Sequence, residues 1–171
     1  MNEYHGPKDY FDAAKSPEAS AEELNELAKS EHGFVRVAVA ANHNTPVETL
    51  SFLVPNKIRT RHEQELALAL AQNLSSPAEI LAILGQKLLP VLDNGRNHQV
   101  GFQSGIVLSS NPKTPMDTLQ FILDEEKSAM QFRKVAARET NRKDVVELLL
   151  KDRSEKVRKQ AENRMREFGH Q

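Results

Sequence analysis

The sequence predicts an all-α fold in which about five pairs of helices stack as a solenoid. A short pattern recurs three times without gaps, and a helical segment rich in alanine and aliphatic residues precedes each copy. No stretch alternates apolar and polar residues with the period of two that a half-buried strand requires. Because a single helix pair cannot bury its own apolar face, we expect neighbouring pairs to share one continuous core.

The repeated pattern is N-x-x-[ST]-P-x-[ED]-x-L, and it occupies residues 42–50, 73–81 and 111–119. Two weaker copies, at 19–24 and 141–146, keep the acid and the apolar residue and lack the proline. We expect Ser or Thr to cap the following helix, with proline in its first turn and the acid completing a capping box. The asparagine is expected to end the preceding helix in the left-handed conformation. The pattern therefore predicts a helix–turn–helix unit and carries no chemistry.

Each copy, full or weak, is flanked by a segment that predicts an inner helix. The third of these segments contains Gly101 and Gly105, which lower its helix propensity. The expected inner helices cover residues 34–41, 65–71, 100–108, 130–137 and 156–165.

We expect the 171 residues to form a single domain, 1–171. Residues 1–15 are interpreted as an N-terminal cap or flexible lead, and residues 154–171 as a C-terminal capping helix. The N-terminal segment is polar and acidic, unlike a secretory signal, and no apolar run is long enough to span a bilayer. The sequence therefore predicts a cytoplasmic protein without a membrane partner.

Composition argues against catalytic and cofactor chemistry. The chain has no cysteine, which excludes disulfides, thiolate metal ligands and iron–sulfur clusters. None of the six histidines is spaced three or four residues from another, so we expect no metal site. The sequence contains no P-loop, dinucleotide fingerprint or nucleophile elbow. We predict that the protein is not an enzyme and needs no cofactor.

The net charge of −1 hides an asymmetry. Residues 1–132 hold 11 Lys and Arg against 17 Asp and Glu, a net of −6, whereas residues 133–171 hold 12 against 7, a net of +5. Such a polarity could join copies of the chain into a homo-oligomer through their acidic and basic ends. Ordinary solvated helix faces are the alternative explanation.

The longest irregular stretch, residues 92–98, is the first candidate binding site. Insertions in repeat proteins gather on one face, which is often the face that binds. Arg96, Asn97 and His98 are therefore candidate partner-binding residues, together with Arg59 and Arg61 of the preceding unit. The alternative is a disordered insertion that the fold tolerates.

The basic C-terminal region is the second candidate. Its first helix and turn contain four candidate partner-binding residues, which are Arg133, Lys134, Arg138 and Arg142. Clustered bases are sufficient for sequence-independent contact with phosphates, so nucleic acid is a possible partner of residues 133–166. Seven acids interleave with the twelve bases of residues 133–171 and the chain has no tryptophan, which favours the polar outer face of a solenoid cap.

Residues 30–50 resemble the leucine-rich repeat variant (LRV) family. The resemblance lies in a Val-Arg helix, an Ala-Ala-Asn turn and a Thr-Pro-x-Glu helix, and residues 152–161 resemble HEAT repeats. It implies a right-handed superhelix similar to HEAT and armadillo folds, and a scaffold role without catalytic residues. The Cys-rich iron–sulfur module of some members cannot apply to a chain without cysteine.

Three functional hypotheses follow from these features. The first is a non-enzymatic interaction scaffold that binds a protein or peptide partner. The second is a HEAT-like nucleic-acid-binding protein that uses residues 133–166. The third is a HEAT-like base-excision glycosylase, which would need a carboxylate at the base of a basic groove that also bears aromatic residues.

Overall fold

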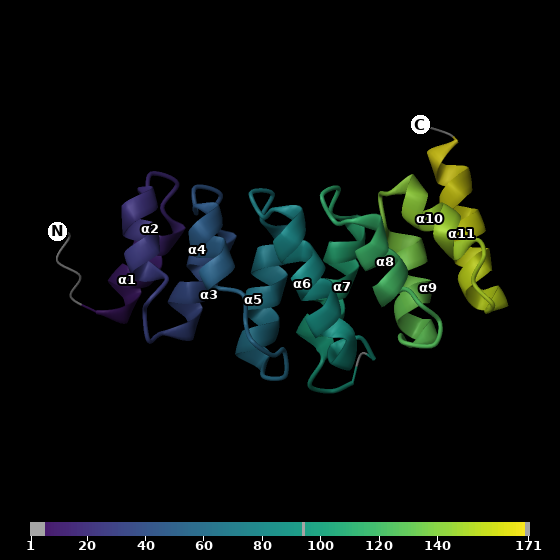
Figure 1. Cartoon of the computed structure of the whole chain (residues 1–171), viewed down its shortest axis with the longest axis horizontal. Coiled ribbons are helices and arrows are strands. Elements are labelled where there is room, and N and C mark those ends of the chain that lie inside the picture. Colours follow the sequence, from purple (N-terminus) through teal and green to yellow (C-terminus); the bar gives the residue numbers. More distant parts are fainter. Residues whose placement is uncertain (1–5, 94, 170–171) are drawn as a thin grey trace.

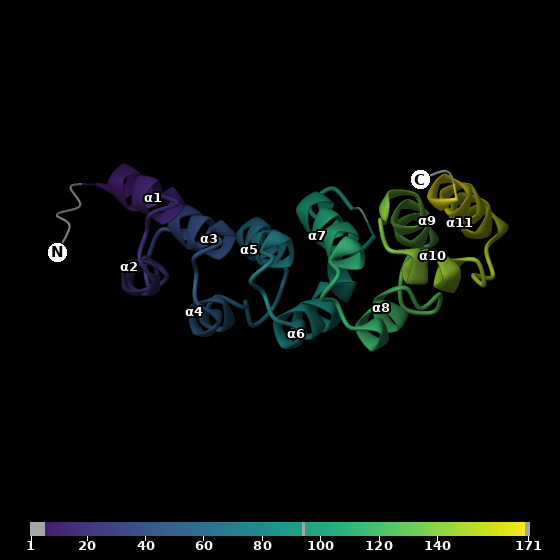
Figure 2. The same ribbon diagram turned by 90° about the horizontal axis from the view of Figure 1, so that it is seen from above.

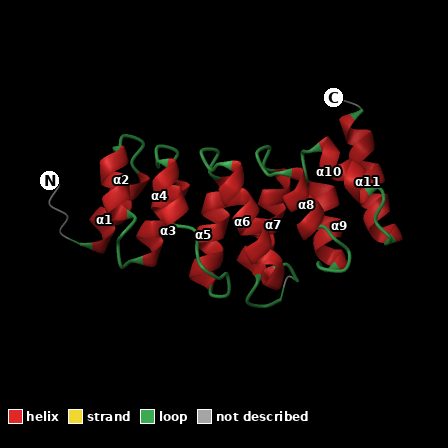
Figure 3. Ribbon diagram, viewed as in Figure 1, coloured by secondary structure: helices red, strands yellow, loops and turns green. Residues whose placement is uncertain are grey.

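The computed structural model describes residues 6–93 and 95–169, and this part of the chain is all-helical. It contains eleven α-helices, one short 3₁₀ helix and no strand (Figure 3). The first six α-helices are α1 (Pro7–Lys15), α2 (Ala21–Leu27), α3 (Gly33–Ala41), α4 (Val47–Phe52), α5 (Arg61–Gln72) and α6 (Ala78–Leu88). They are followed by η1 (Leu89–Val91), α7 (Gln99–Ser110), α8 (Met116–Ile122), α9 (Met130–Glu139), α10 (Lys143–Leu149) and α11 (Glu155–Phe168). The all-α prediction is confirmed.

The helices form two rows along an elongated molecule (Figure 1). The odd-numbered helices, α1 to α11, lie side by side in one row, and the even-numbered helices form the second (Figure 2). Extensive packing occurs only between helices that are neighbours or next neighbours along the chain, such as α3 with α5 and α5 with α7. The described ends of the chain therefore lie at opposite ends of the stack.

The five expected inner helices correspond to α3, α5, α7, α9 and α11, each somewhat longer than expected. Residues 1–15 were interpreted as a cap or flexible lead; from Pro7 onward they form α1, which packs against α3.

The two glycines of α7 allow neighbouring side chains to pack closely against this helix. A Cβ on Gly101 would lie 2.4 Å from Val91 Cγ2, and one on Gly105 would lie 2.4 Å from Leu92 Cδ2.

The leucine of the repeated pattern anchors the second row. Leu50, Leu81 and Leu119 are fully buried, as are Leu24 and Val146 in the two weaker copies. Valine and alanine side chains of the first row, such as Val39 and Ala71, complete a core that runs the length of the stack. The pattern thus places a fully buried aliphatic side chain in each helix of the second row, from α2 to α10.

The Ser or Thr of the pattern does not cap the following helix, contrary to our expectation. Thr45, Ser76 and Thr114 instead donate hydrogen bonds of 2.6–2.7 Å to the carbonyl oxygen six residues earlier, in the last turn of the preceding helix. The proline that follows is the N-cap residue itself, so the hydroxyl lies one residue too early to reach the first turn. The hydroxyl therefore stabilises the end of one helix. The weaker copy at Ser20 does cap, accepting from Glu23 N at 3.1 Å.

The asparagine of the pattern is extended rather than left-handed, with φ near −70° in all three copies. Its side chain links successive helix pairs. Asn73 Nδ2 donates to Ala40 O at 2.8 Å and Asn42 O at 2.9 Å, while its Oδ1 accepts from Ser75 N at 2.8 Å. Asn42 makes the corresponding three bonds, and Asn111 makes two of them, to Ala71 O and from Lys113 N. Buried amides thus form a ladder along one edge of the stack.

Candidate functional site

The loops that precede α5 and α7 form a pocket of about 340 Å³ between them. Both loops lie along the lower edge of the stack in Figure 1, opposite the asparagine ladder. We call this pocket the basic groove, and it is lined by Arg59, Thr60, Arg61, Gln64, Arg96, Asn97, Gln99 and Val100. The structure therefore brings together Arg59, Arg61, Arg96 and Asn97, four of the five residues predicted for the first candidate site.

A capping box at the start of α5 holds one wall of the groove. Thr60 Oγ1 accepts from Glu63 N at 3.3 Å, and Glu63 Oε2 accepts from the backbone N–H groups of Thr60 and Arg59 at 2.7 and 2.8 Å. These backbone donors, Thr60 first, lower the pKa of the Glu63 carboxyl. The Glu63 carboxylate is thus ionised and directed at the helix terminus, where it fixes the backbone that carries Arg59.

Gln64 joins the two walls of the groove. Its side chain is 1% exposed, and its Nε2 donates to Arg59 O at 3.2 Å and to Asn97 O at 2.7 Å. Its Oε1 accepts from Gly101 N at 2.8 Å, in the first turn of α7. One buried amide therefore sets the separation of the two loops. Our sequence analysis missed Gln64, which lies just before the expected helix 65–71.

In several inner helices the fourth residue donates hydrogen bonds to the loop that precedes the helix, and this shared position could have identified Gln64. Arg36 in α3 and Arg158 in α11 each donate to two carbonyl oxygens of the loop before their own helix. In α7 this position is Phe102, so the 92–98 loop has no such donor of its own and uses Gln64 of α5. The polar residue at a fixed helical position was the available sequence signal.

His98 lies in the 92–98 loop and does not line the groove. Its Nδ1 lies 2.6 Å from Asp93 Oδ1, which also accepts from Gly95 N at 3.0 Å. The bond with His98 lowers the pKa of the Asp93 carboxyl. Asn94, which lies in the same loop, is outside the described residues.

The arginines of the groove differ in whether their guanidinium groups already have a bonding partner. Arg61 Nε lies 2.8 Å from Glu65 Oε1, in an ion pair on the exposed face of α5. The guanidinium groups of Arg59 and Arg96 make no hydrogen bond or ion pair with any described residue, and both residues are exposed. No carboxylate or aromatic side chain is among the lining residues. The groove can attract an anion, and it lacks the carboxylate and aromatic residues that the glycosylase hypothesis requires.

The C-terminal candidates are only partly available to a partner. Arg133 is buried, and its Nε lies 2.6 Å from Oδ2 of the equally buried Asp152, while Nη1 donates to Ser128 O. Arg142 donates to Asn111 O and Thr114 O at 3.0 and 2.7 Å and pairs with Asp144. The prediction of direct partner contact is therefore wrong for Arg133, because its buried guanidinium is bonded to Asp152 and Ser128 and is not accessible to a partner. Arg142 mainly links two helix pairs.

The other two C-terminal candidates lie closer to the surface. Lys134 is half-buried on α9, and Arg138 is exposed with its Nε 2.7 Å from Glu139 Oε1. Arg164 and Arg158 also donate to backbone carbonyls, Arg164 to Thr140 O at 2.8 Å. Several bases of residues 133–166 are thus used within the fold, whereas others, such as Lys156 and Lys159, are exposed.

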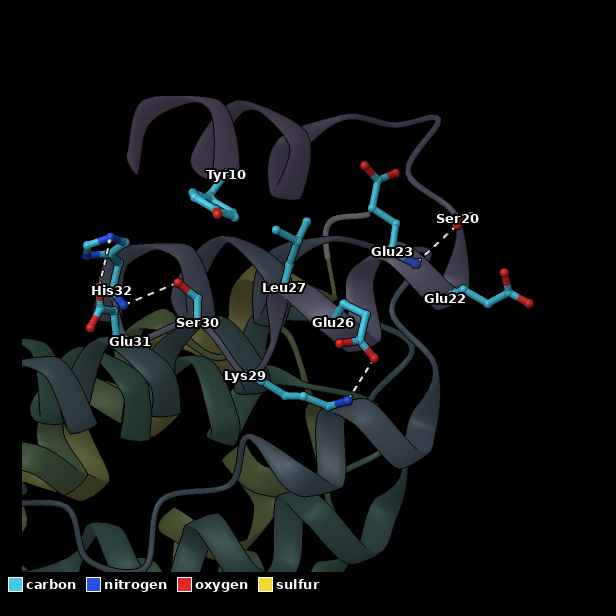
Figure 4. A pocket seen from close by; sticks show the side chains of 10 residues that line it. All are labelled: Tyr10, Ser20, Glu22, Glu23, Glu26, Leu27, Lys29, Ser30, Glu31 and His32. Atoms are coloured by element: carbon cyan, nitrogen blue, oxygen red, sulfur yellow. Dashed lines mark hydrogen bonds and ion pairs between the residues drawn. The ribbon is translucent and has the colours of Figure 1, made fainter. Parts of the chain in front are cut away.

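A second, larger pocket of about 760 Å³ lies at the N-terminal end of the stack, between α1 and α2 (Figure 4). Tyr10 and Leu27 contribute to its lining, and four carboxylates surround them, those of Glu22, Glu23, Glu26 and Glu31. Lys29 Nζ pairs with Glu26 Oε1 at 2.7 Å, and Ser20 caps α2.

In the part of the chain that the structure describes, no three His, Asp or Glu side chains are placed to hold a metal ion. No helix there is long and apolar enough to cross a membrane.

Comparison of the chain with protein-family models, with curated proteins and with solved structures gives no match.

Proposed function

We propose that the chain is a non-enzymatic α-solenoid scaffold that binds a protein or peptide partner, whose acidic segment lies in the basic groove. The convergence of Arg59 and Arg61, at the start of α5, with Arg96, in the loop before α7, carries the proposal. Guanidinium groups in a groove whose lining residues include no carboxylate can steer an anionic partner and orient it by paired hydrogen bonds. The two-row stack supports the prediction of a solenoid of about five helix pairs, while its right-handed, LRV- or HEAT-like character and its cytoplasmic location stay predictions.

Charge reversal of the groove tests the proposal. We expect Arg59→Glu with Arg96→Glu to abolish co-purification of a partner from native lysate and binding of a glutamate-rich peptide. The matched control is Lys156→Glu with Lys159→Glu, which reverses two exposed charges on α11 and should leave both intact. Equal retention of partner and peptide by the groove variant would contradict the proposal.

Two other predictions stay open beside this one. Nucleic-acid binding through residues 133–166 has no specific observation in its favour, because Arg133, Arg142 and Arg164 serve the fold. Association of copies through acidic and basic ends also remains a prediction. A salt titration with duplex and single-stranded oligonucleotides measures the first, and sedimentation at low and high salt measures the second.

A further inference from the structure

We infer that the basic groove is a site for a phosphoryl group, carried on a phosphorylated serine or threonine of the acidic partner segment. This inference rests on the proposed function and specifies which anion the groove selects. The groove is preorganised for one compact anion: its two walls are held at a fixed separation by the buried Gln64, bonded to Arg59 O, Asn97 O and Gly101 N.

The number and origin of the cationic groups favour a phosphoryl group over a carboxylate. One guanidinium is sufficient to bind a carboxylate through two parallel hydrogen bonds. Here Arg59 and Arg96, whose guanidinium groups have no partner among the described residues, come from the loops before α5 and α7. Arg61, which pairs with Glu65, adds a third cation at the start of α5. A phosphoryl group presents three oxygens in different directions and carries close to two negative charges, so it can use donors that a planar carboxylate cannot.

The first turn of α7 also favours a phosphoryl group. Gln99 and Val100, the first two residues of α7, line it, and the first turn of α7 contains no acidic residue. The positive end of this helix therefore adds to the field of the three arginines. By contrast, the first turn of α5 contains Glu63, whose carboxylate is already bonded to the Thr60 and Arg59 backbone. The anion thus belongs to the α7 side, between Arg59 and Arg96.

The size of the groove limits the ligand. A volume of about 340 Å³ is near the lower end of the range for small-molecule pockets. It has room for a phosphorylated side chain with its neighbouring backbone. The lining has no aromatic side chain on which a nucleobase could stack, which disfavours a nucleotide or a single-stranded nucleic acid.

Three fluorescent peptides with one acidic sequence and a central phosphoserine, glutamate or serine test this inference. We expect the phosphoserine peptide to bind the full chain at least about tenfold more tightly than the glutamate peptide. Its affinity should fall as the pH drops through about 6, where the phosphoryl group loses its second charge, whereas that of the glutamate peptide should not. Inorganic phosphate should compete weakly.

Two variants separate charge from geometry. Arg59→Lys with Arg96→Lys keeps the charge and removes the planar forks, so we expect the preference for phosphoserine to fall to about threefold or less. Gln64→Leu should reduce the same ratio because the walls lose their common anchor, while circular dichroism reports whether the helices remain. Lys156→Arg with Lys159→Arg is the matched control and should change nothing.

The outcomes are distinguishable. If the phosphoserine and glutamate peptides bind equally well, the inference is wrong and the proposed function stands. If no peptide binds, both are wrong. If a single-stranded oligonucleotide binds more tightly than the phosphoserine peptide, the groove is a nucleic-acid site and the inference is overturned.

Discussion

At the scale of single residues, buried side-chain amides and guanidinium groups donate hydrogen bonds to carbonyl oxygens at helix ends and turns. Two successive helix pairs expose carbonyl oxygens to each other at their turns, and each needs a donor. Asn73 donates two hydrogen bonds and accepts one, all within 3 Å, and Gln64 makes the same set of bonds at 2.7–3.2 Å across the opposite edge. No buried side-chain nitrogen or oxygen of the described residues lacks a partner.

Asn73→Leu tests the ladder. The substitution removes the side-chain donor to the carbonyls of Ala40 and Asn42 and the acceptor of the Ser75 N–H, in a site that is 5% exposed; of the two carbonyls, Asn42 O keeps its bond with Thr45 N. We expect a loss of about 1–3 kcal/mol in the free energy of unfolding, measured by urea denaturation. The exposed His43, in the equivalent turn, is the control, and His43→Ala should change stability by less than about 0.5 kcal/mol. Equal effects at the two positions would contradict a structural role for the amide.

The sequence was sufficient to predict helices and their order because each pattern position acts locally. The buried leucines at 50, 81 and 119 follow from periodicity alone. The role of Thr45 was not predictable, because a hydroxyl beside a helix boundary can serve either helix, and a shift of one residue decides which. The burial of Arg133 depended on Asp152, which lies in the turn between α10 and α11 and has no sequence pattern in common with it.

At the scale of helices, small residues set how closely the elements approach. Gly105 of α7 lies against Leu92 and the ring of Phe132, where a Cβ would come within 2.4 Å of Leu92 Cδ2 and 2.8 Å of Phe132 Cε2. Phe132 in turn meets Phe102 edge to face, with ring centroids 5.6 Å apart. The two glycines lower the helix propensity of this segment, and the packing of α7 against its neighbours outweighs that loss.

Gly105→Ala measures that balance. Alanine gains up to about 1 kcal/mol in helix propensity, but the added methyl must displace two buried apolar side chains. We expect net destabilisation of about 1–3 kcal/mol, because overpacking costs more than the propensity returns. Gly6→Ala is the control, since nothing lies within 4 Å of its added Cβ. A stabilised Gly105→Ala variant would show that Leu92 and Phe132 can move aside.

The junction of α3 and α5 contains a histidine that makes stability depend on pH. His62 Nε2 lies 3.0 Å from Arg36 Nη2, and the ring lies against Gly33. Burial first, and the Arg36 charge second, lower the pKa of His62 below its ordinary 6.5. The unfolded chain therefore binds this proton more readily than the folded one, so the contribution is complete above pH 6.5 and is lost as the pH falls below it.

Urea titrations at several pH values check this dependence. We expect His62→Gln, which cannot titrate, to lose less stability than the wild type between about pH 7 and pH 5. The amide oxygen of glutamine can still accept from Arg36, so the contact need not be lost. The contrary result, parallel pH profiles for the two proteins, would mean that His62 has the same pKa in the folded and unfolded chains.

At the scale of the whole molecule, the two-row stack makes stability local. Helices pack extensively only with neighbours and next neighbours along the chain, so α1 and α11 each have one neighbour in their row, whereas α5 has two. In such an arrangement stability is close to a sum of unit and interface contributions, and the ends open before the middle. The basic groove lies between α5 and α7, in the interior of the row, where both loops are tied by Gln64.

A pair of equal core truncations tests this locality. Leu24 in α2 and Leu70 in α5 are both fully buried, so Leu24→Ala and Leu70→Ala remove the same side chain at an end and in the middle. Each costs about 2–5 kcal/mol where it acts. We expect native-state hydrogen exchange of the Leu24 variant to show lost protection in α1, α2 and α3 alone, with the groove's affinity for the phosphoserine peptide unchanged. The Leu70 variant should lose protection across α3 to α7 and bind the peptide more weakly, because it weakens the helix that carries Arg61 and Gln64. Uniform loss of protection in both variants would mean that the stack unfolds as one cooperative unit.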